Sequence, residues 1–475
     1  MTYPVKRVHL IAICGMGMGS LAGLLKARGC VVTGSDQNIY PPMSDQIASL
    51  QIPVKVGFSP DNLFPRPDLV VVGNAVSRNN PEVEATLKNK IPYLSMPQAV
   101  DQFFLRDRIS VVVAGTHGKT TTSGLLAWLL ERTGCAPGFL VGGVLNNFGR
   151  SYQLGSGRHF VVEGDEYDTA FFDKGPKFLH YHPQVLILNP IEFDHADIYR
   201  DLPQMMTAFE RLVSSLDPGC LVIAHAQNSN VRSLLPRLSC RAITFGFSPD
   251  AEVGADQLQL SPTTRFRLLY KGKGLQPKPQ GEITSPLMGR HNAENLLALI
   301  ALFLEWGKPL KELQAALTEF KGVKRRQEIL GIHEGITLID DFAHHPTAIR
   351  ETLQAIRGRY PQSRLVALFE PRSNTTRRSI FQNDFPAAFE AADRVFLGPV
   401  YLPEKIPPSE RLDLAKLVEE LERRGKSARS FDSIDTLAET AAREAIPGDV
   451  YCLMSNGSFG NLSQKLLAHW SGREG

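Results

Sequence analysis

The chain alternates short apolar runs with longer amphipathic ones from its first residues onward. Up to about residue 105 the apolar runs are strand-like, and helix-like segments such as MGSLAGLLKARG lie between them. The strand-like runs are RVHLIAI, CVVTGSD, PVKVGF and DLVVVG. Strands that alternate with helices in this way predict a parallel sheet covered by helices.

Two further blocks repeat this alternation. The second contains DRISVVVAG, RHFVVEGDEYD, QVLILNPIEFDHAD, GCLVIAHA and RAITFGF, then a polar stretch that predicts hairpins, and it ends in the helix-like GRHNAENLLALIALFLEWG. The third begins near FKGVKRRQEIL and gives another strand–helix series. We therefore predict an α/β protein of three domains, each with a mainly parallel sheet, at residues 1–106, 107–322 and 323–475.

Composition narrows the classes of function. The 475 residues are 43% apolar and 21% charged, which is enough to form sizeable cores. The near balance of 52 basic and 49 acidic residues predicts no nucleic-acid partner. The six cysteines form no CxxC pair, which indicates neither zinc nor a disulfide framework and favours a reducing cytoplasm. Glycines interrupt the apolar N-terminal run, and no run reaches about 18 apolar residues, so we expect no secretory signal and no membrane helix.

The segment AGTHGKTTT, residues 114–122, lies between a β-branched strand and a helix-like run, as a phosphate-binding loop does. Gly118, Lys119 and Thr120 match the core of the usual pattern, although Val113 stands where that pattern has its first glycine. Lys119 could reach the β- and γ-phosphates, and Thr120 could coordinate Mg²⁺. A plain helix N-cap is the alternative, but it leaves Lys119 without a role. We favour phosphate binding.

The turn GMGMGS places Gly15, Gly17 and Gly19 directly after the first predicted strand. Such glycines let the backbone approach a diphosphate at a helix N-terminus. Asp36 ends the next predicted strand, where a ribose would lie, but Ser20 stands where the dinucleotide-binding pattern has its third glycine. From this segment alone, a dehydrogenase and a turn without a ligand both stay open.

Two acidic segments follow predicted strands of the second block. EGDEYD contains Glu163, and EFDHAD contains His195. Because parallel strands end at one edge of a sheet, we expect both residues near the phosphate loop, where Mg²⁺ would find carboxylates together with phosphates. A solvated acidic turn and a structural histidine are the alternatives.

Amide and basic side chains supply further candidates. Asn292 and Asn295 lie three residues apart at a helix start, so they share a face and could read the edge of a base; helix capping by Asn292 is the alternative. Loops of the third block carry a set suited to phosphate or carboxylate recognition: Arg325, Arg326, Asp341, His344, His345, Arg372 and Arg377.

The ordered set of motifs resembles the Mur ligases of peptidoglycan assembly over nearly the whole chain. The matching segments are GTHGKTTT, EGDEYD, FDHAD, GRHNAEN, RRQE and DDFAHHPTAI, and the family's phosphate loop is the short GTxGKT/S form. The resemblance implies a Rossmann-like N-terminal domain that binds a UDP-sugar, a central P-loop domain that binds ATP, and a Rossmann-like C-terminal domain that closes on ATP and binds a peptide. It further implies an ATP- and Mg²⁺-dependent ligase that activates UDP-N-acetylmuramate as an acyl phosphate and forms an amide bond.

The resemblance also implies roles for individual residues. The implied catalytic residues are Lys119, Glu163 and His195, and the implied Mg²⁺ ligands are Thr120, Glu163 and His195. The implied ATP-binding residues are Gly115, Thr116, Gly118, Lys119, Thr120, Thr121, Asn292, Asn295, Arg326 and Asp341. The implied UDP-sugar-binding residues are Gly15, Met16, Gly17, Met18, Gly19 and Asp36, and the implied peptide-binding residues are His344, Arg372, Ser373, Asn374 and Arg377.

The identity of the amine substrate depends on a few segments. EGDEYDTAFFDK, IEFDHAD and EPRSNT are similar to the family members that join the murein tripeptide L-Ala-γ-D-Glu-meso-diaminopimelate to UDP-N-acetylmuramate in peptidoglycan recycling. GRHN and DDFAHHP are similar to those that add L-alanine, but the acidic motif and EPRSNTTRR depart from that group. We expect the tripeptide ligase, with the alanine ligase, an NAD-dependent dehydrogenase and a non-catalytic P-loop module as alternatives. We also expect a cytoplasmic monomer or weak dimer without a membrane partner.

Overall fold

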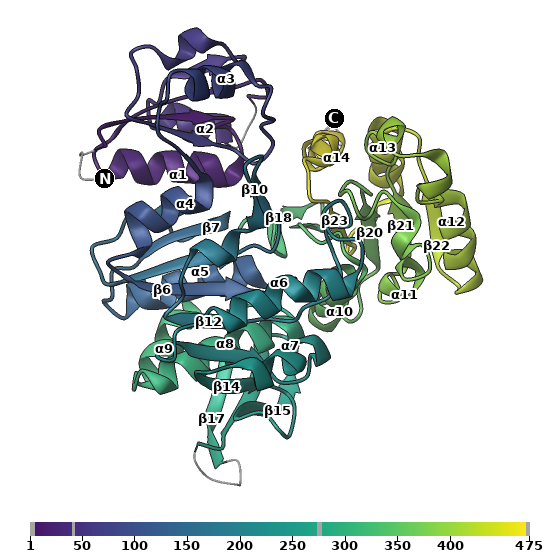
Figure 1. The fold of residues 1–475 in the computed structure, drawn as a ribbon. Helices are drawn as coiled ribbons and strands as arrows, with labels where there is room; N and C mark the ends of the chain where they lie inside the picture. Colours follow the sequence, from purple (N-terminus) through teal and green to yellow (C-terminus); the bar gives the residue numbers. More distant parts are fainter. Residues whose placement is uncertain (1–4, 40–42, 273–277, 472–475) are drawn as a thin grey trace. The chain divides into compact units, whose positions relative to one another are not determined.

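The computed structural model describes residues 5–39, 43–272 and 278–471 (Figure 1). The chain forms two compact units. The first unit comprises Met1–Glu192, Leu202–Val253 and Ala298–Lys321. The second comprises Phe193–Asp201, Gly254–Leu297 and Gly322–Gly475. The chain therefore passes between the units several times, and the short segment 193–201 belongs with the C-terminal residues.

The N-terminal sheet of the first unit is parallel throughout and has the strand order β3-β2-β1-β4-β5. Its strands are β1 Arg7–Ile11, β2 Val31–Asp36, β3 Val54–Val56, β4 Leu69–Val72 and β5 Tyr93–Ser95. Its helices are α1 Met16–Ala27, α2 Met43–Ser49, α3 Pro81–Lys88 and α4 Met96–Val100. All four residues of β4 are buried, as expected of a strand covered on both faces.

A second sheet of the first unit follows the order β14-β13-β12-β6-β9-β7-β8, and only β8 runs antiparallel to its neighbour. Its strands are β6 Ile109–Ala114, β7 Gly138–Leu145, β8 Arg150–Gln153, β9 His159–Gly164, β12 Val185–Leu188, β13 Leu221–His225 and β14 Arg241–Gly246. Its helices are α5 Lys119–Arg132, α6 Leu202–Ser214, α7 Ser229–Leu234 and α9 Leu310–Thr318. The β6–β9 register pairs Val113 with Glu163, so the phosphate loop and the first acidic segment leave the sheet side by side.

A small hairpin that the sequence pattern does not predict links the two sheets of the first unit. Its strands are β10 Asp168–Ala170 and β11 Asp173–Pro176. Phe171 and Phe172 pack against the apolar core of the N-terminal sheet, and Phe172 meets Tyr93 edge-on with ring centroids 4.9 Å apart. Ser95 Oγ donates to Asp173 Oδ2 at 3.0 Å. The tail of the acidic motif, DTAFFDK, therefore has a structural role in joining the sheets.

The second unit contains a sheet of strand order β18-β19-β23-β20-β21-β22, in which only β18 is antiparallel. Its strands are β18 Glu328–His333, β19 Ile336–Asp341, β20 Leu365–Phe369, β21 Arg394–Leu397, β22 Ser427–Ser430 and β23 Val450–Met454. Its helices are α10 Pro346–Arg359, α11 Phe385–Ala388, α12 Leu414–Arg423, α13 Ile434–Glu444 and α14 Leu462–Ser471.

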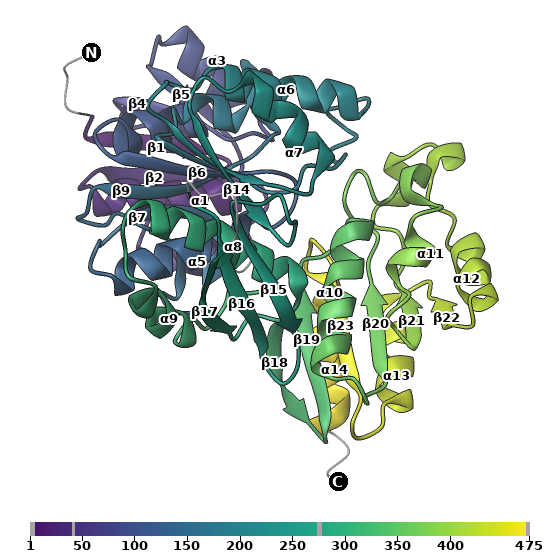
Figure 2. The ribbon, with the colours of Figure 1, turned by 90° about the horizontal axis from the view of Figure 1, so that it is seen from below.

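Alternation along the strands explains why helices cover both faces of this sheet. Helices α10, α11 and α12 lie on one face of the sheet, and α13 and α14 lie on the other (Figures 1 and 2). In β19, Ile339 belongs to the apolar core that contains residues of α10, α11 and α12, whereas its neighbour Leu338 belongs to the core that contains residues of α13 and α14. Successive side chains of a strand point to opposite faces, so two apolar cores form around one sheet.

Three strands and a long helix follow β14 along the chain. Strands β15 Val253–Gln259, β16 Thr264–Tyr270 and β17 Lys278–Ser285 follow one another, and β16 and β17 pair antiparallel. They confirm the predicted hairpins, although residues 273–277 lie outside the described residues. The long helix predicted after them is α8, Arg290–Glu305.

The predicted fold class is confirmed, since every predicted parallel strand series is present. The exact boundaries at residues 106 and 322 stay a prediction. Among the described residues, every helix is too short or too polar to cross a membrane.

Candidate active site

The phosphate loop of the first unit needs glycine at two positions. Gly115 has φ 126°, and a Cβ there would lie 2.6 Å from the carbonyl oxygen of Asn189. Gly118 has φ 76° and immediately precedes α5. Both are left-handed conformations that favour glycine. The loop is therefore a tight turn from β6 into α5, with the first N–H groups of the helix at its end.

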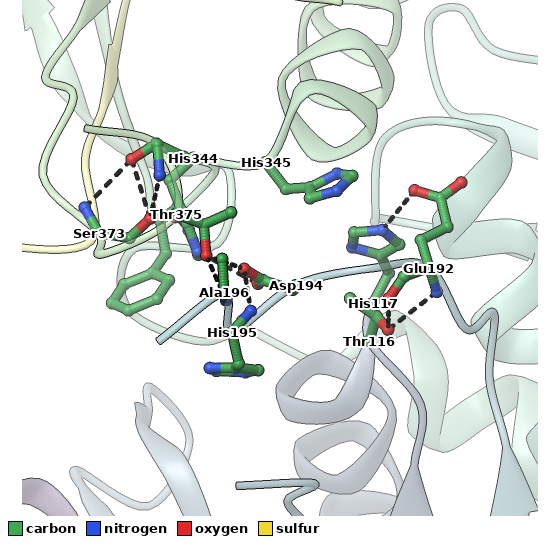
Figure 3. Close-up of polar contacts among 12 residues, drawn as sticks. Thr116, His117, Glu192, Asp194, His195, Ala196, His344, His345, Ser373 and Thr375 are labelled. Carbon is green, nitrogen blue, oxygen red and sulfur yellow. Dashed lines mark hydrogen bonds and ion pairs between the residues drawn. The ribbon is translucent and has the colours of Figure 1, made fainter. Parts of the chain in front are cut away.

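Side-chain and backbone bonds fix this loop to the segment after β12. Thr116 donates through its N–H to the carbonyl of Pro190 at 2.9 Å and through its hydroxyl to the carbonyl of Glu192 at 2.8 Å. His117 Nε2 donates to Glu192 Oε2 at 2.9 Å (Figure 3). Thr121 lies buried in the first turn of α5. The loop is thus held in one conformation by residues far away in sequence.

Lys119 occupies the first position of α5, and its ammonium group is already engaged. Its Nζ donates to the carbonyl of Gly115 at 2.6 Å and to Glu166 Oε2 at 2.8 Å. Burial acts to lower the pKa of Lys119, but the carboxylates of Glu166 and Asp165 outweigh it and raise that pKa above its ordinary value. Lys119 is therefore held as a cation beside the phosphate loop.

Glu163 ends the neighbouring strand and is surrounded by donors. Its Oε2 accepts from the hydroxyl of Thr120 at 3.1 Å. Its Oε1 accepts from the N–H of Gly142 at 2.5 Å and from the hydroxyl of Ser123 at 3.3 Å. The structure thus brings two of the predicted metal ligands, Thr120 and Glu163, into direct contact. Both offer oxygen, the ligand atom that Mg²⁺ prefers, so the donor set fits this cation.

A second lysine, which is absent from the predicted site residues, pairs with a carboxylate of the acidic segment. Lys177 Nζ donates to Asp165 Oδ2 at 3.0 Å and lies 4.1 Å from the ring centroid of Tyr167. Burial acts to raise the pKa of Asp165, but Lys177 and Lys119 outweigh it and hold that pKa below its ordinary value. Asp165 and Glu166 of the acidic motif are therefore in largely buried ion pairs and not in a solvated turn. In the sequence, the indication of this ion pair is the second lysine of KGPKF, which directly follows β11.

In the second unit, the two predicted adenine-contacting asparagines contact one another. Asn295 Nδ2 donates to Asn292 Oδ1 at 3.1 Å. Asn292 Nδ2 donates in turn to the carbonyl of Met288 at 2.8 Å and to Gln327 Oε1 at 3.1 Å. Both asparagines are buried. These bonds connect the start of α8 to the RRQE motif, and Gln327 is a participant that the predicted residue set lacked.

The predicted ribose and phosphate contacts of the second unit join the same cluster. Asp341, the last residue of β19, accepts the N–H groups of Gln327 and Ala343, each at 2.7 Å. Burial raises the pKa of Asp341, and the charge of Arg326 only partly offsets it. The Arg326 guanidinium lies over the ring of Phe342, 4.7 Å from its centroid. Asn292, Asn295, Arg326 and Asp341 are thus brought together within one unit.

Residues 372–377, here called the peptide loop, follow β20. Arg372 lies with its guanidinium carbon 3.7 Å from the ring centroid of Tyr401, and its Nη1 donates to Glu370 Oε1 at 3.3 Å. Ser455 Oγ donates to Glu370 Oε2 at 2.5 Å. A Cβ on Gly457 would lie 2.0 Å from Arg372 Nε. The guanidinium is therefore held in place by stacking, by a carboxylate and by a close approach to glycine backbone.

Other members of the predicted peptide-binding set form contacts that hold the peptide loop in place. Arg377 is buried, and its Nη1 donates to the carbonyl of Tyr401 at 3.0 Å while its Nη2 donates to Asn374 Oδ1. The hydroxyls of Ser373 and Thr376 lie 2.8 Å apart. Of the two arginines in the predicted peptide-binding set, Arg372 has about a quarter of its side chain exposed, 24%, whereas Arg377 is buried. Arg377 is thus an anchor of the loop, and ligand binding by Arg372 stays a prediction.

His195 lies in segment 193–201 of the second unit, and its neighbour Asp194 contacts the peptide loop. Asp194 Oδ1 accepts the hydroxyl of Thr375 at 2.9 Å. His344 Nε2 lies 3.8 Å from Asp194 Oδ2, and its Nδ1 donates to the carbonyl of Phe342 at 3.0 Å. Burial acts to raise the pKa of Asp194, but His344 and His195 outweigh it and hold that pKa well below its usual range.

The glycine turn of the N-terminal sheet opens α1. Gly15 is exposed and precedes Met16, the first residue of the helix, and no side chain caps that helix end. Gly17 and Gly19 approach methionine side chains, with a Cβ at either position 3.1 Å from a methyl group. Met18 is buried, so its side chain belongs to the core. The backbone N–H groups of the turn remain the feature suited to a diphosphate.

Both carboxylate oxygens of Asp36 accept hydrogen bonds from backbone N–H groups near this turn. It accepts the N–H of Cys14 at 2.8 Å and that of Asn38 at 2.9 Å. Ser20, in place of the third glycine, has its hydroxyl 2.7 Å from that of Ser151 on β8. Asp36 thus fixes the shape of the turn, and Ser20 joins the N-terminal sheet to its neighbour.

Fold and site together define an α/β enzyme of the phosphate-loop type, with a buried lysine and a buried carboxylate at the edge of a parallel sheet. Three family models match along the chain: "Mur ligase family, catalytic domain" over residues 7–108, "Mur ligase middle domain" over 113–303, and "Mur ligase, glutamate ligase domain" over 325–457.

Whole-chain relatives agree with these matches. The UDP-N-acetylmuramate–L-alanyl-γ-D-glutamyl-meso-2,6-diaminoheptandioate ligase of Escherichia coli K12 is 41% identical over 463 residues, which are 97% of each chain. A UDP-N-acetylmuramate–L-alanine ligase of Desulforapulum autotrophicum is 30% identical over 97% of this chain and 98% of its own. The crystal structure of a murein peptide ligase from Psychrobacter arcticus superposes with a TM-score of 0.73 at 34% identity and covers 98% of both chains.

The chain belongs to the Mur ligase family, a family of ATP-dependent ligases that form carbon–nitrogen bonds. The predicted family and the predicted enzyme class are confirmed. The dehydrogenase alternative has no support in these matches. The roles of individual residues stay predictions.

Proposed function

We propose that this chain joins the amine of the tripeptide L-Ala-γ-D-Glu-meso-diaminopimelate to the carboxylate of UDP-N-acetylmuramate, with cleavage of ATP, as a step of peptidoglycan recycling. One observation carries the proposal: the 41% identity, over 97% of both chains, to the Escherichia coli ligase named for these substrates. The alanine ligase of Desulforapulum autotrophicum matches an equal share of the chain at 30%. Because coverage is equal, the difference in identity favours the tripeptide.

The first unit would hold the triphosphate. The N–H groups at the start of α5 and the Lys119 ammonium would surround the β- and γ-phosphates. Thr120 and Glu163 would hold Mg²⁺, with His195 as a third ligand by family match. When bound, the metal would supply positive charge that lets two anions, a carboxylate and a phosphate, approach. Lys119 would exchange its contact with Glu166 for a phosphate oxygen.

The reaction would then proceed in two balanced steps. A carboxylate oxygen of UDP-N-acetylmuramate attacks the γ-phosphorus of ATP, and the bond from this phosphorus to the bridging oxygen breaks. ADP leaves, and the carboxylate has become an acyl phosphate. The peptide amine next attacks the acyl carbon, and phosphate and a proton leave as the amide forms. Cations and N–H groups of the loop would stabilise the charge that moves in the first step. Asn292, Asn295, Asp341 and Arg326 would contact the remainder of ATP, and the glycine turn at Gly15–Gly19 would contact the UDP diphosphate.

The peptide loop is suited to an anionic amine substrate. The tripeptide carries several carboxylates, and an arginine fork pairs with a carboxylate in two parallel hydrogen bonds. Arg372 offers such a fork, held in advance by Tyr401 and Glu370. An arginine that needs no reordering loses less conformational entropy on binding. We further propose that the enzyme acts in the cytoplasm, where ATP and nucleotide sugars are available, as a monomer or weak dimer, which sedimentation at assay concentration would test.

A substrate competition tests the proposal. The full chain is incubated with Mg-ATP, UDP-N-acetylmuramate and either the tripeptide or L-alanine at equal concentration, and product mass and ADP release are recorded. We expect the UDP-muramoyl tripeptide and faster ADP release with the tripeptide. Reactions that lack UDP-N-acetylmuramate should release no ADP above background. Faster release with L-alanine would replace the proposal by the alanine ligase.

A further inference from the structure

His195 has a backbone conformation that needs support from its surroundings. Its φ is 56°, in the left-handed region that residues other than glycine rarely adopt. Its carbonyl accepts the N–H groups of Ile198 at 2.8 Å and of Tyr199 at 2.9 Å, so the turn that follows depends on the same conformation. The position of the His195 side chain is therefore set by whatever holds segment 193–201.

One hydroxyl group makes two of the bonds that hold this segment. Thr375 Oγ1 donates to Asp194 Oδ1 at 2.9 Å and accepts the N–H of Ala196 at 3.2 Å (Figure 3). The two bonds lie on either side of His195 in the sequence. Asp194 Oδ1 also accepts the N–H of His195 itself, at 2.7 Å. Thr375 is 1% exposed, so water does not compete for these bonds.

Two further bonds attach the same segment to the rest of the second unit. Asn374 Nδ2 donates to Asp197 Oδ2 at 2.9 Å, and His345 Nε2 donates to the carbonyl of Phe193 at 3.2 Å. Asn374 and Thr375 both belong to the peptide loop, and the buried Arg377 anchors that loop at its end. The segment is thus attached to the loop at its centre and held at its start by His345.

We propose that Thr375 is a positioning residue that couples the peptide loop to His195, so that a peptide bound at the loop reinforces the placement of this histidine. The identity of the peptide rests on the proposed function, but the connection itself rests on contacts within one unit. A ligand that rigidifies the loop would lower the cost of ordering segment 193–201 for the next ligand, and by linkage the effect runs in both directions.

Hydrogen–deuterium exchange of the full chain, without nucleotide or metal, tests the coupling in two arms. In the first arm, Thr375→Val is compared with the wild type. We expect the amides of Ala196, Ile198 and Tyr199 to exchange roughly three- to tenfold faster, since one bonded anchor is worth about 1 kcal/mol. In the second arm, saturating tripeptide should protect segment 193–201 as well as the peptide loop in the wild type, and the loop alone in Thr375→Val.

Two matched variants separate positioning from general loss of stability. Thr375→Ser keeps the hydroxyl and should restore wild-type exchange. Thr264→Val makes the same change at a buried threonine of the second unit whose hydroxyl has no hydrogen-bond partner among the described residues, and it should leave segment 193–201 unchanged. Faster exchange at Ala196 alone, or tripeptide protection confined to the loop in the wild type, would overturn the proposal. Absence of any tripeptide effect at the loop would instead count against the proposed function, and the first arm would still decide the role of Thr375.

Discussion

Carboxylates stand at a sheet edge in both units, but their surroundings differ. After β9 in the first unit, Glu166 and Asp165 each face a lysine ammonium, and the pKa of Asp165 is held below its ordinary value. At the end of β19 in the second unit, burial raises the pKa of Asp340 to about 6, and Arg325 offsets this only in part. Burial raises the pKa of Asp341 as well. At the first edge, each of these carboxylates is paired with a lysine. At the second edge, cations offset the cost of burying the carboxylates only in part.

The difference indicates how each edge would meet a ligand. In the first unit, the Lys119 ammonium is paired with Glu166, and we expect it to exchange or share this partner when a phosphate binds, so that the buried cation stays paired throughout. This exchange limits the desolvation penalty that an unpaired charge would carry. In the second unit, the carboxylate of Asp341 accepts the backbone N–H groups of Gln327 and Ala343 and so shapes a loop. Three substitutions break or sharpen this contrast.

Removal of the Lys119 ammonium leaves the carboxylates of the first edge without one of their cations. It should have the largest effect on turnover and on stability. We expect Lys119→Met to lower kcat by roughly 10²–10³-fold, as loss of one preorganised cation or donor does. It should also lower the free energy of unfolding by about 3 kcal/mol, because Glu166, with a fully buried side chain, loses its counter-charge. Steady-state ADP release and thermal unfolding measure the two effects.

A double variant separates these two consequences. Lys119→Met combined with Glu166→Gln removes both charges, so most of the lost stability should return while turnover stays low. Recovery of turnover in the double variant would show that the carboxylate of Glu166, and not the missing ammonium, blocks the nucleotide. Wild-type stability of Lys119→Met alone would contradict the buried ion pair.

The first edge also shows what could and could not be predicted from sequence. Glu163 and the phosphate loop were predicted together because both end strands of one parallel sheet, and the β6–β9 register confirms that placement. Lys177 was missed because its partner Asp165 lies across a hairpin that no periodicity announces. Contacts of this kind depend on how the chain turns between two residues, and a motif records only one of the two.

The peptide loop gives the same lesson for charged side chains. Sequence reasoning treats Arg372 and Arg377 alike, since both are arginines in a predicted loop. The structure separates them, because Tyr401 stacks on one guanidinium while its backbone carbonyl accepts from the other. Gly457, which leaves space for Arg372, lies in a segment that the sequence analysis assigned no chemistry.

Gly457→Ala disturbs the second edge without removing a charge. A Cβ would lie 2.0 Å from Arg372 Nε, so the guanidinium must move. We expect the KM for the tripeptide to rise roughly 10- to 100-fold, the loss of a hydrogen bond to a charged group, while the KM for ATP stays near that of the wild type. Steady-state kinetics with each substrate varied in turn measures this split.

Two comparisons make the result specific. Gly219→Ala adds a Cβ with nothing within 4 Å and should leave both KM values unchanged. Arg372→Ala should raise the KM for the tripeptide as well, and adding Gly457→Ala to it should have no further effect. If the two changes were additive instead, the peptide carboxylate would have another partner than Arg372.

The smallest expected effect concerns Asp340, and its sign depends on pH. Burial acting on an acid whose ordinary pKa is 3.8 raises the folded-state pKa to about 6, so between these values the folded state binds more protons than the unfolded state. Stability therefore falls as pH rises through this window, and the full penalty is present above pH 6. Asp340→Asn should raise stability at pH 7.5 by roughly 1–3 kcal/mol, and the gain should shrink as the pH falls to 5.

Thermal midpoints of the variant and the wild type across this range measure the difference, with Asp432→Asn, a change at an exposed aspartate, as the control. A gain that did not depend on pH would show that Asp340 is compensated after all, and the contrast between the two sheet edges would then rest on Asp341 alone.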